Sequence, residues 1–286
     1  MRAEPLVFMG FTTPYDQARV VLFGAPFDGT TSYRPGTRFA PARIRLESEG
    51  IETYSPYADD DLERHGLSDV GDLTLPFGNP AAVLDIISQH TTRLIGDEKI
   101  PFMLGGEHLV TLGVVDALAK KHPDLHVIQL DAHADLRDDY LGEKRSHATV
   151  MRRVHELLGD GRIHQLGIRS GTEEEFAFGR QHTDFHPFDF AAIKDVVNAI
   201  GEAPVYLTID LDVLDPSIMS GTGTPEPGGV TYNALLDALN TMRGLRFVGA
   251  DIVELSPDYD ASGVSTAVAC KTVREVAFLL ARAPKR

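Results

Sequence analysis

The sequence contains a single cysteine, Cys270, among its 286 residues. An intramolecular disulfide is therefore excluded, and so low a cysteine content is typical of a reducing compartment. No apolar stretch approaches the roughly 20 residues that a membrane helix requires, and the short apolar run at 6–11 is followed by no small-residue cleavage site. We therefore expect a soluble, cytoplasmic protein that makes no contact with a membrane.

Basic residues are also fewer than acidic ones. The chain has 27 Lys and Arg and 42 Asp and Glu, which gives a formal net charge of −15. A surface of this charge repels the phosphate backbone and attracts cations, so we expect no nucleic-acid partner. Hydrophobic residues make up 43% of the chain, and Gly and Pro contribute only 26 and 17 residues. This composition excludes a disordered or low-complexity protein.

Short apolar runs alternate with amphipathic stretches along most of the chain. The runs are nearly continuous, as is typical of parallel strands covered on both faces, and predict strands at Val20–Gly24, Phe102–Leu104, His126–Leu130, Ile163–Ile168, Val205–Ile209 and Phe247–Ile252. Helical spacing predicts helices at Ala81–Ile95, Leu109–Lys121, Ala148–Leu158, Tyr232–Met242 and Ser265–Arg282. This alternation predicts an α/β fold, a three-layer α/β/α sandwich with a mostly parallel central sheet. No linker or repeat divides the chain, so we expect one domain over residues 1–286.

The strand predicted at His126–Leu130 runs directly into the sequence D-A-H-A-D. If the chain stays extended there, Asp131, His133 and Asp135 share one face, because strand side chains alternate with a period of two. They also follow the carboxyl end of a strand, where open α/β sheets bind their ligands. This spacing is more specific for a metal site than any single acidic or histidine residue would be.

Two other predicted strands end in residues of the same kind. One is followed by Asp210 and Asp212, and the other by two glycines, Glu107 and His108. Taken singly, the Asp-Leu-Asp sequence is more typical of a turn or cap, and His108 of a core histidine. Together, four carboxylates and two histidines would repel one another in a dry crevice without a cation. Oxygen and imidazole donors without a thiolate suit Mn²⁺, and two such ions can hold a bridging hydroxide at neutral pH.

These motifs resemble those of the arginase/agmatinase (ureohydrolase) family of dimanganese enzymes. The likeness rests on G-G-E-H at 105–108, D-A-H-A-D at 131–135 and D-L-D-V-L-D-P at 210–216, and continues through 24–28, Ser146-His147, 221–229 and 251–257, so that it covers nearly the whole chain. Glu107 departs from the family, which often has Asp there, but it is not a ligand position. The resemblance implies an arginase-like fold, two Mn²⁺ per subunit and a homo-oligomer, a trimer or hexamer.

The resemblance also implies roles for individual residues. One metal would be held by His108, Asp131, Asp135 and Asp210, and the other by His133, Asp131, Asp210 and Asp212, with Asp131 and Asp210 bridging. Glu254 would bind the substrate guanidinium, and Asp135 would stabilise the intermediate formed by hydroxide attack on the guanidinium carbon and pass a proton to the leaving amine. His147 would contact the substrate and act as a proton shuttle with a pKa suited to neutral conditions.

The segment at 136–147 bears on the choice of substrate. Its D-L-R-x-x-Y-x-G-x-x-x-S-H pattern resembles bacterial and archaeal agmatinases rather than arginases, so the expected reaction is hydrolysis of agmatine to putrescine and urea, as in polyamine biosynthesis. Acidic residues at 138, 139 and 143 either attract the dicationic substrate or form an ordinary solvated loop. Arg137 leaves an alternative open, since it can bind a carboxylate, and guanidinobutyrate or arginine would then be the substrate.

Other classes of protein make different demands on the sequence. A phosphoesterase with two metals would need cationic residues beside them, and the motifs offer only Arg137. A non-enzymatic relative would be expected to have lost ligands, whereas all six are present. The remaining histidines carry no functional context, and no role is expected for His65, His90, His122, His155 and His182. Cys270 lies on an apolar helical stretch and is expected to pack in the core.

Overall fold

The computed structural model describes residues 6–284 and contains one eight-stranded sheet. Its strands are β1 (Val20–Ala25), β4 (Leu67–Asp72), β5 (Ile100–Gly105), β6 (His126–Leu130), β7 (Ile163–Ile168), β8 (Asp184–Pro187), β9 (Pro204–Asp210) and β10 (Arg246–Val253). They lie in the order β4-β1-β5-β10-β9-β6-β7-β8, and every neighbouring pair is parallel. A separate antiparallel hairpin joins β2 (Tyr54–Ser55) to β3 (Asp60–Asp61).

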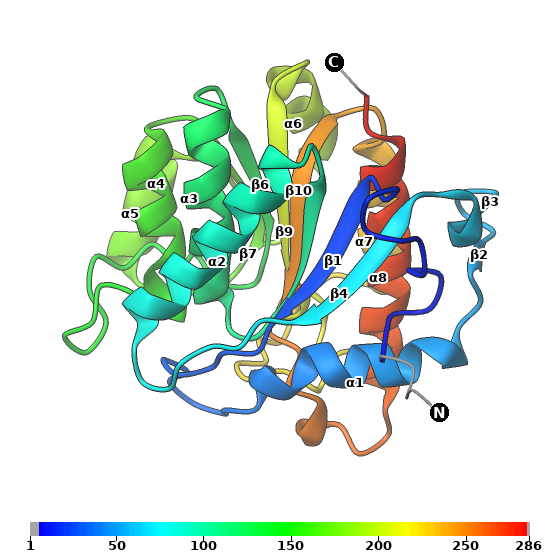
Figure 1. Ribbon diagram of the computed structural model, residues 1–286. Coiled ribbons are helices and arrows are strands. Elements are labelled where there is room, and N and C mark those ends of the chain that lie inside the picture. Colours follow the sequence, from blue (N-terminus) through cyan, green and yellow to red (C-terminus); the bar gives the residue numbers. More distant parts are fainter. Residues whose placement is uncertain (1–5, 285–286) are drawn as a thin grey trace.

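Helices cover both faces of this sheet (Figure 1). They are α1 (Ala40–Glu47), α2 (Pro80–Gly96), α3 (Thr111–Lys121), α4 (Val150–Leu158), α5 (Glu173–His182), α6 (Ile193–Ile200), α7 (Tyr232–Thr241) and α8 (Val264–Arg282). Apolar residues of α1, α6, α7 and α8 join one core cluster, and those of α2, α3, α4 and α5 join the other. The predicted α/β/α sandwich with a parallel central sheet is therefore confirmed.

Alternation along the strands divides the core between the two faces. In β1, Val20 and Leu22 belong to one cluster, whereas Val21 and Phe23 belong to the other, and all four are fully buried. A strand that is covered on both sides has no polar face, which is why the central strands appear in the sequence as apolar runs. Cys270 is buried on α8, as expected.

The sequence prediction missed the strands at the two ends of the sheet, β4 and β8. Their sequences, L-S-D-V-G-D and D-F-H-P, are rich in polar residues because an edge strand has one unpaired side and is only partly covered. Helices α5 and α6 were not predicted either. The helix expected to begin at Pro41 is present as α1, with the proline in its first turn. No helix among residues 6–284 is long and apolar enough to span a membrane.

Candidate metal centre and active site

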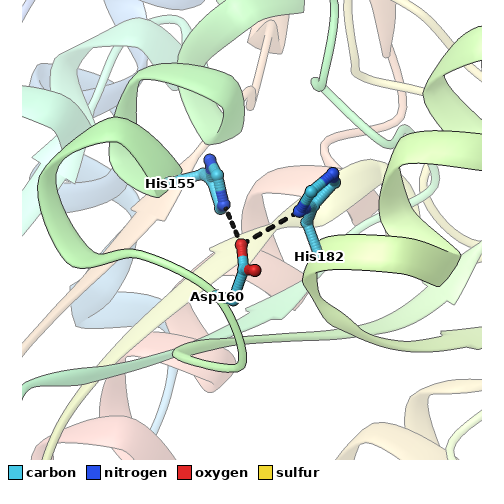
Figure 2. A group of neighbouring side chains, drawn as sticks. All are labelled: His155, Asp160 and His182. Atoms are coloured by element: carbon cyan, nitrogen blue, oxygen red, sulfur yellow. Dashed lines mark hydrogen bonds and ion pairs between the residues drawn. The ribbon is translucent and has the colours of Figure 1, made fainter.

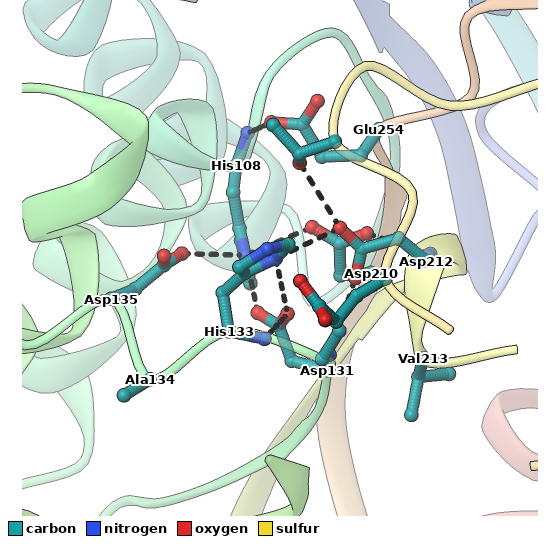
Figure 3. Close-up of polar contacts among 12 residues, drawn as sticks. His108, Asp131, His133, Ala134, Asp135, Asp210, Asp212, Val213 and Glu254 are labelled. Atoms are coloured by element: carbon teal, nitrogen blue, oxygen red, sulfur yellow. Dashed lines mark hydrogen bonds and ion pairs between the residues drawn. The ribbon is translucent and has the colours of Figure 1, made fainter. Parts of the chain in front are cut away.

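The predicted metal ligands and Glu254 lie at the carboxyl ends of four strands that are consecutive across the middle of the sheet, β5, β10, β9 and β6. His108 follows β5, Glu254 follows β10, Asp210 ends β9, and the 131–135 segment follows β6. Figure 3 shows the carboxylates and imidazoles from these four strand ends pointing toward one another. Residues separated by more than a hundred positions in sequence are thus brought into one buried cluster.

The first group of donors surrounds the imidazole of His108. Its Nδ1 lies 3.0 Å from Asp131 Oδ2, 3.1 Å from Asp135 Oδ2 and 3.5 Å from Asp210 Oδ2. Although this nitrogen is buried, it makes no hydrogen bond with any described residue. A buried nitrogen that faces three carboxylates without bonding to them fits the geometry of a ligand whose lone pair points at a shared cation.

The second group lies beside the first. His133 Nδ1 is 3.0 Å from Asp212 Oδ2 and 3.8 Å from Asp131 Oδ1. One donor atom each from His108, Asp131 and Asp210 lies within 4.8 Å of the others, and the same holds for Asp131, His133 and Asp212. Asp131 therefore belongs to both groups, as a bridging ligand must. Bridging by Asp210 stays a prediction, because it belongs to the first group only.

The sequence prediction assumed an extended chain through residues 131–135. In the structure, the chain does not stay extended there. Strand β6 ends at Leu130, His133 N donates a hydrogen bond to Asp131 Oδ1 at 2.7 Å, and Asp135 has a φ of 54°. The three side chains converge through this turn rather than through strand alternation. A non-glycine residue in the left-handed region costs free energy and is found preferentially at functional sites.

Burial and like charge perturb the pKa values of the cluster. Burial alone would lower the pKa of His108, but the carboxylates of Asp131, Asp135 and Asp210 raise it well above its usual value. Burial and the charge of Asp131 raise the pKa of Asp135 to about 7. Burial and the neighbouring Asp212 raise the pKa of Asp210 well above its ordinary range. Shifts of this kind show that the cluster favours added positive charge, which a divalent cation supplies.

Polar groups inside the strands, which sequence analysis did not identify, hold the donors in place. Thr208 Oγ1 lies 2.9 Å from His108 Nε2, and Gln129 Nε2 donates to Asp131 Oδ2 at 2.6 Å. Thr208 and Gln129 stand two residues before Asp210 and Asp131, so they share a strand face with them. In the sequence, each could have been identified as a polar residue inside an apolar run, two positions before a candidate ligand. A hydrogen-bond partner on the imidazole nitrogen that does not face the metal fixes the orientation of a ligating histidine.

Glu254 follows β10 in a strained backbone conformation, with a φ of 63°. Its Oε1 accepts a hydrogen bond from His108 N at 2.7 Å, and its own N donates to Gly106 O at 3.0 Å. The side chain is buried, and burial together with the charge of Glu107 raises its pKa well above the usual value. A buried carboxylate with unused acceptor capacity beside the donor cluster is suited to bind a cationic group.

Gly106 is required where β5 approaches the neighbouring loop. A Cβ at this position would lie 1.8 Å from Phe27 O, which leaves no room for any side chain. The backbone nitrogens of Gly106 and Glu107 donate to Ala25 O and Phe27 O. The paired glycines therefore let the chain turn tightly and present His108 to the cluster.

A cavity of about 260 Å³ opens beside the donors and is lined by Ser32, His133, Asp135, Arg137, Tyr140, His147, Ala148, Ser170, Gly171, Glu175 and Thr224. Two contacts hold the Arg137 side chain in the wall of this cavity. Its Nε lies 3.2 Å from the buried Glu175, and its guanidinium stacks 4.8 Å from the centre of the Tyr140 ring. A larger cavity of about 640 Å³ lies at the opposite edge of the sheet, where it is lined by residues at or directly before the starts of β1, β5 and β10. The smaller cavity is the candidate active site, because only there do the donors converge.

His147 lies in the cavity wall with its backbone nitrogen 3.1 Å from Thr30 Oγ1. Burial and the neighbouring His133 and His108 lower its pKa to about 4. This differs from the near-neutral value expected from the sequence, and the difference arises because the imidazole is enclosed. Thr30 is in turn fixed by the buried Glu107, to which its hydroxyl donates at 2.6 Å.

The acidic residues at 138, 139 and 143 have local partners. Asp138 pairs with Arg153 at 2.8 Å, Asp139 accepts from Gly142 N at 2.8 Å, and Glu143 accepts from Arg145 N at 2.8 Å. Their hydrogen bonds therefore shape the loop itself. This arrangement favours the solvated-loop interpretation over a role in attracting substrate.

Comparison with known proteins places the fold and the site in one family. The arginase family model matches residues 18–279. An agmatinase of Bacillus cereus is 45% identical over 274 residues, covering 94% of each chain, and a guanidinobutyrase of Pseudomonas aeruginosa is 34% identical over 93% of this chain and 87% of its own. The solved structure of the agmatine ureohydrolase of Thermoplasma volcanium superposes with a TM-score of 0.88 at 35% identity, covering 98% of this chain and 95% of the other.

The chain therefore belongs to the arginase family and is a ureohydrolase enzyme. The resemblance inferred from the sequence motifs, including the likeness to bacterial agmatinases, is confirmed. The buried Asp and His clusters give this enzyme residues capable of binding metal ions.

Proposed function

We propose that this enzyme hydrolyses agmatine to putrescine and urea with two Mn²⁺ ions held by His108, Asp131, His133, Asp135, Asp210 and Asp212. The observation that carries the reaction class is the convergence of these donors beside a cavity and a buried carboxylate. The choice of Mn²⁺ rests on donor chemistry, since four carboxylates and two imidazoles without a thiolate suit this ion. When bound, two such ions lower the pKa of a water molecule and supply a nucleophile at neutral pH.

The protein's own residues bind and orient the guanidinium. Glu254 offers its remaining carboxylate lone pairs to the planar N–H groups, in the charge-assisted geometry that guanidinium favours. Asp135 borders the cavity and is placed to pass a proton to the leaving amine, a hypothesis that normal turnover by Asp135→Asn would rule out. His147 borders the same cavity, and its lowered pKa keeps the imidazole neutral. A neutral imidazole of low pKa is a weak base, so its proposed role is to exchange hydrogen bonds with the substrate.

Two observations favour agmatine as the substrate. Agmatine carries no carboxylate, and the charge of the Arg137 guanidinium in the cavity wall is already balanced by Glu175. The agmatinase of Bacillus cereus is also more similar to this chain than the guanidinobutyrase is, at 45% against 34% identity. Guanidinobutyrate remains the second candidate, because Arg137 lines the cavity and a guanidinium can bind a carboxylate.

The test is urea release from agmatine, arginine and 4-guanidinobutyrate, measured in parallel with Mn²⁺ for the wild type and Arg137→Met. We expect preference for agmatine, and retention of that preference in the variant. Preference for guanidinobutyrate in the wild type, lost selectively in Arg137→Met, would assign Arg137 as a carboxylate anchor and overturn the choice of substrate. No urea from any of the three would refute the proposed substrate class.

Assembly as a homo-oligomer, trimeric or hexameric, is proposed on the family resemblance alone, as are a cytoplasmic location and a role in putrescine biosynthesis. Light scattering on the protein as it elutes from a size-exclusion column tests the oligomeric state, since a trimer or hexamer differs several-fold in mass from the 31.2 kDa chain.

A further inference from the structure

A second cluster of potential ligands lies at the C-terminal ends of α4 and α5. Figure 2 shows the side chains of His155, Asp160 and His182 pointing toward one another. Asp160 Oδ1 is 2.7 Å from His155 Nε2 and 3.0 Å from His182 Nδ1. The loop that carries Asp160 leads into the amino end of β7. The cluster therefore lies at the opposite edge of the sheet from the candidate active site and is separate from it.

The backbone around this cluster is held by hydrogen bonds on both sides of Asp160. Gly159 N donates to His155 O at 2.8 Å, and Gly161 N donates to His182 O at 2.9 Å. Both glycines have a positive φ, 81° and 70°, which a residue with a side chain adopts at a cost. The turn thus ties Asp160 directly to the two helix ends that carry the histidines.

The two imidazoles are also restrained by an aromatic ring. The centre of the Phe178 ring lies 5.0 Å from that of His155 and 4.3 Å from that of His182. Because the rings pack on a common neighbour, their nitrogens are oriented before any ion arrives. Such preorganisation reduces the conformational entropy lost on binding.

The donor set matches the requirements of a zinc ion. Zn²⁺ accepts imidazole nitrogen and carboxylate oxygen at roughly 2.0–2.2 Å in a tetrahedron, which places the ligand atoms about 3.3 Å apart. The two separations from Asp160 are those of hydrogen bonds, about 0.6 and 0.3 Å shorter than this spacing, so the imidazole nitrogens would move slightly away from Asp160 and give up their protons when the ion binds. One donor atom from each residue lies within 4.8 Å of the others. The Asp160 side chain is 68% exposed, so solvent can supply a fourth ligand.

We propose that His155, Asp160 and His182 bind one Zn²⁺ ion, distinct from the metals of the active site. The ion would join the ends of α4 and α5 to the turn that leads into β7 and stabilise their packing. Imidazole donors favour Zn²⁺ over Mn²⁺, whereas the carboxylate-rich active site suits Mn²⁺.

The proposal is tested by calorimetric titration of ZnCl₂ into the Mn²⁺-loaded enzyme, with excess Mn²⁺ in the buffer. The wild type is compared with His155→Ala/His182→Ala and with the control His186→Ala, which removes a similar histidine–aspartate pair outside the cluster, 2.7 Å from Asp184. Zinc that enters the active site is common to all three proteins. Differences between them therefore report the second cluster.

We expect the wild type and His186→Ala to bind one more equivalent of zinc than the double variant. We also expect zinc to raise the unfolding temperature of these two proteins by more than that of the double variant. Urea release with Mn²⁺ should be the same in all three. Asp160→Ala, a change in an exposed turn, provides a second test if the double variant does not fold, and should weaken this binding at least about tenfold. If the wild type and a folded variant bind zinc with equal stoichiometry and affinity, the proposal is overturned. This outcome does not depend on which substrate the enzyme hydrolyses.

Discussion

Replacing Thr208 by Val tests whether His108 is a metal ligand without touching the donors themselves. Thr208 is fully buried, and its hydroxyl lies 2.9 Å from His108 Nε2. When Nε2 donates this bond, Nδ1 is left unprotonated and faces the carboxylates of the cluster, which is the tautomer that binds a metal. Valine keeps the shape of threonine but leaves Nε2 without a partner.

The expected loss follows from this role in orienting the ring. Removing the partner of a ligating histidine weakens metal binding by about 10–100-fold, or about 1.4–2.8 kcal/mol. The Thr208 hydroxyl also opposes the rise that burial causes in the pKa of Asp251. A matched control is Thr111→Val, because the Thr111 hydroxyl donates to Asp251 at 2.7 Å, whereas Thr111 bonds His108 only through its backbone nitrogen, which valine keeps.

The assay is Mn²⁺ affinity, measured by calorimetry on metal-depleted protein, together with urea unfolding of each variant. Both variants should lose stability, by about 1–3 kcal/mol each, because each removes a hydrogen bond from a buried polar group. Only Thr208→Val should lose Mn²⁺ affinity. If its affinity falls no further than that of Thr111→Val, the Thr208 bond does not orient a metal ligand and the reasoning is refuted.

Further changes test the substrate site, the metal requirement, a loop and the core. Glu254→Gln should lower kcat/KM for agmatine roughly tenfold to a hundredfold at unchanged Mn²⁺ content, since it removes about 1.5–3 kcal/mol of charge-assisted bonding; unchanged kinetics would exclude guanidinium binding by this residue. A chelator should abolish urea release and added Mn²⁺ should restore it, whereas activity that survives complete metal depletion would contradict a metal mechanism. Hydrogen bonds from Ser217, Gly228 and Gly229 lower the pKa of Asp215 to about 2 from 3.8. They therefore stabilise the fold above pH 4, and this contribution is lost as pH falls toward 2, so chemical unfolding should show Asp215→Asn to be destabilising at pH 7 but not at pH 2. Arg45→Met should cost about 3–5 kcal/mol in the free energy of unfolding, because it leaves Asp69 buried without its 2.7 Å partner; a loss below 1 kcal/mol would contradict this.

The sequence predicted the centre of the sheet better than its edges. Strands such as β6 and β9 are covered on both faces, and burial requires an apolar run that is visible in the sequence. The edge strands β4 and β8 are only partly covered and carry polar residues, so the same criterion fails for them.

The site shows a similar division. The candidate ligands were predictable because they follow directly after apolar runs, where a parallel sheet gathers its strand ends. The left-handed backbone conformation of Asp135 was not predictable, because the position is not occupied by glycine or asparagine, which are typical of that conformation. His155 and His182 received no role, because they end two different helices and only the fold brings them to Asp160.

The central claim is that four strand ends assemble one site for two metal ions. Anomalous diffraction at the manganese edge from crystals grown with Mn²⁺ tests this most directly. Two peaks are expected at the carboxyl edge of the sheet, one within reach of His108 and the other within reach of His133, with Asp131 between them. A single peak, or none among these residues, would contradict it.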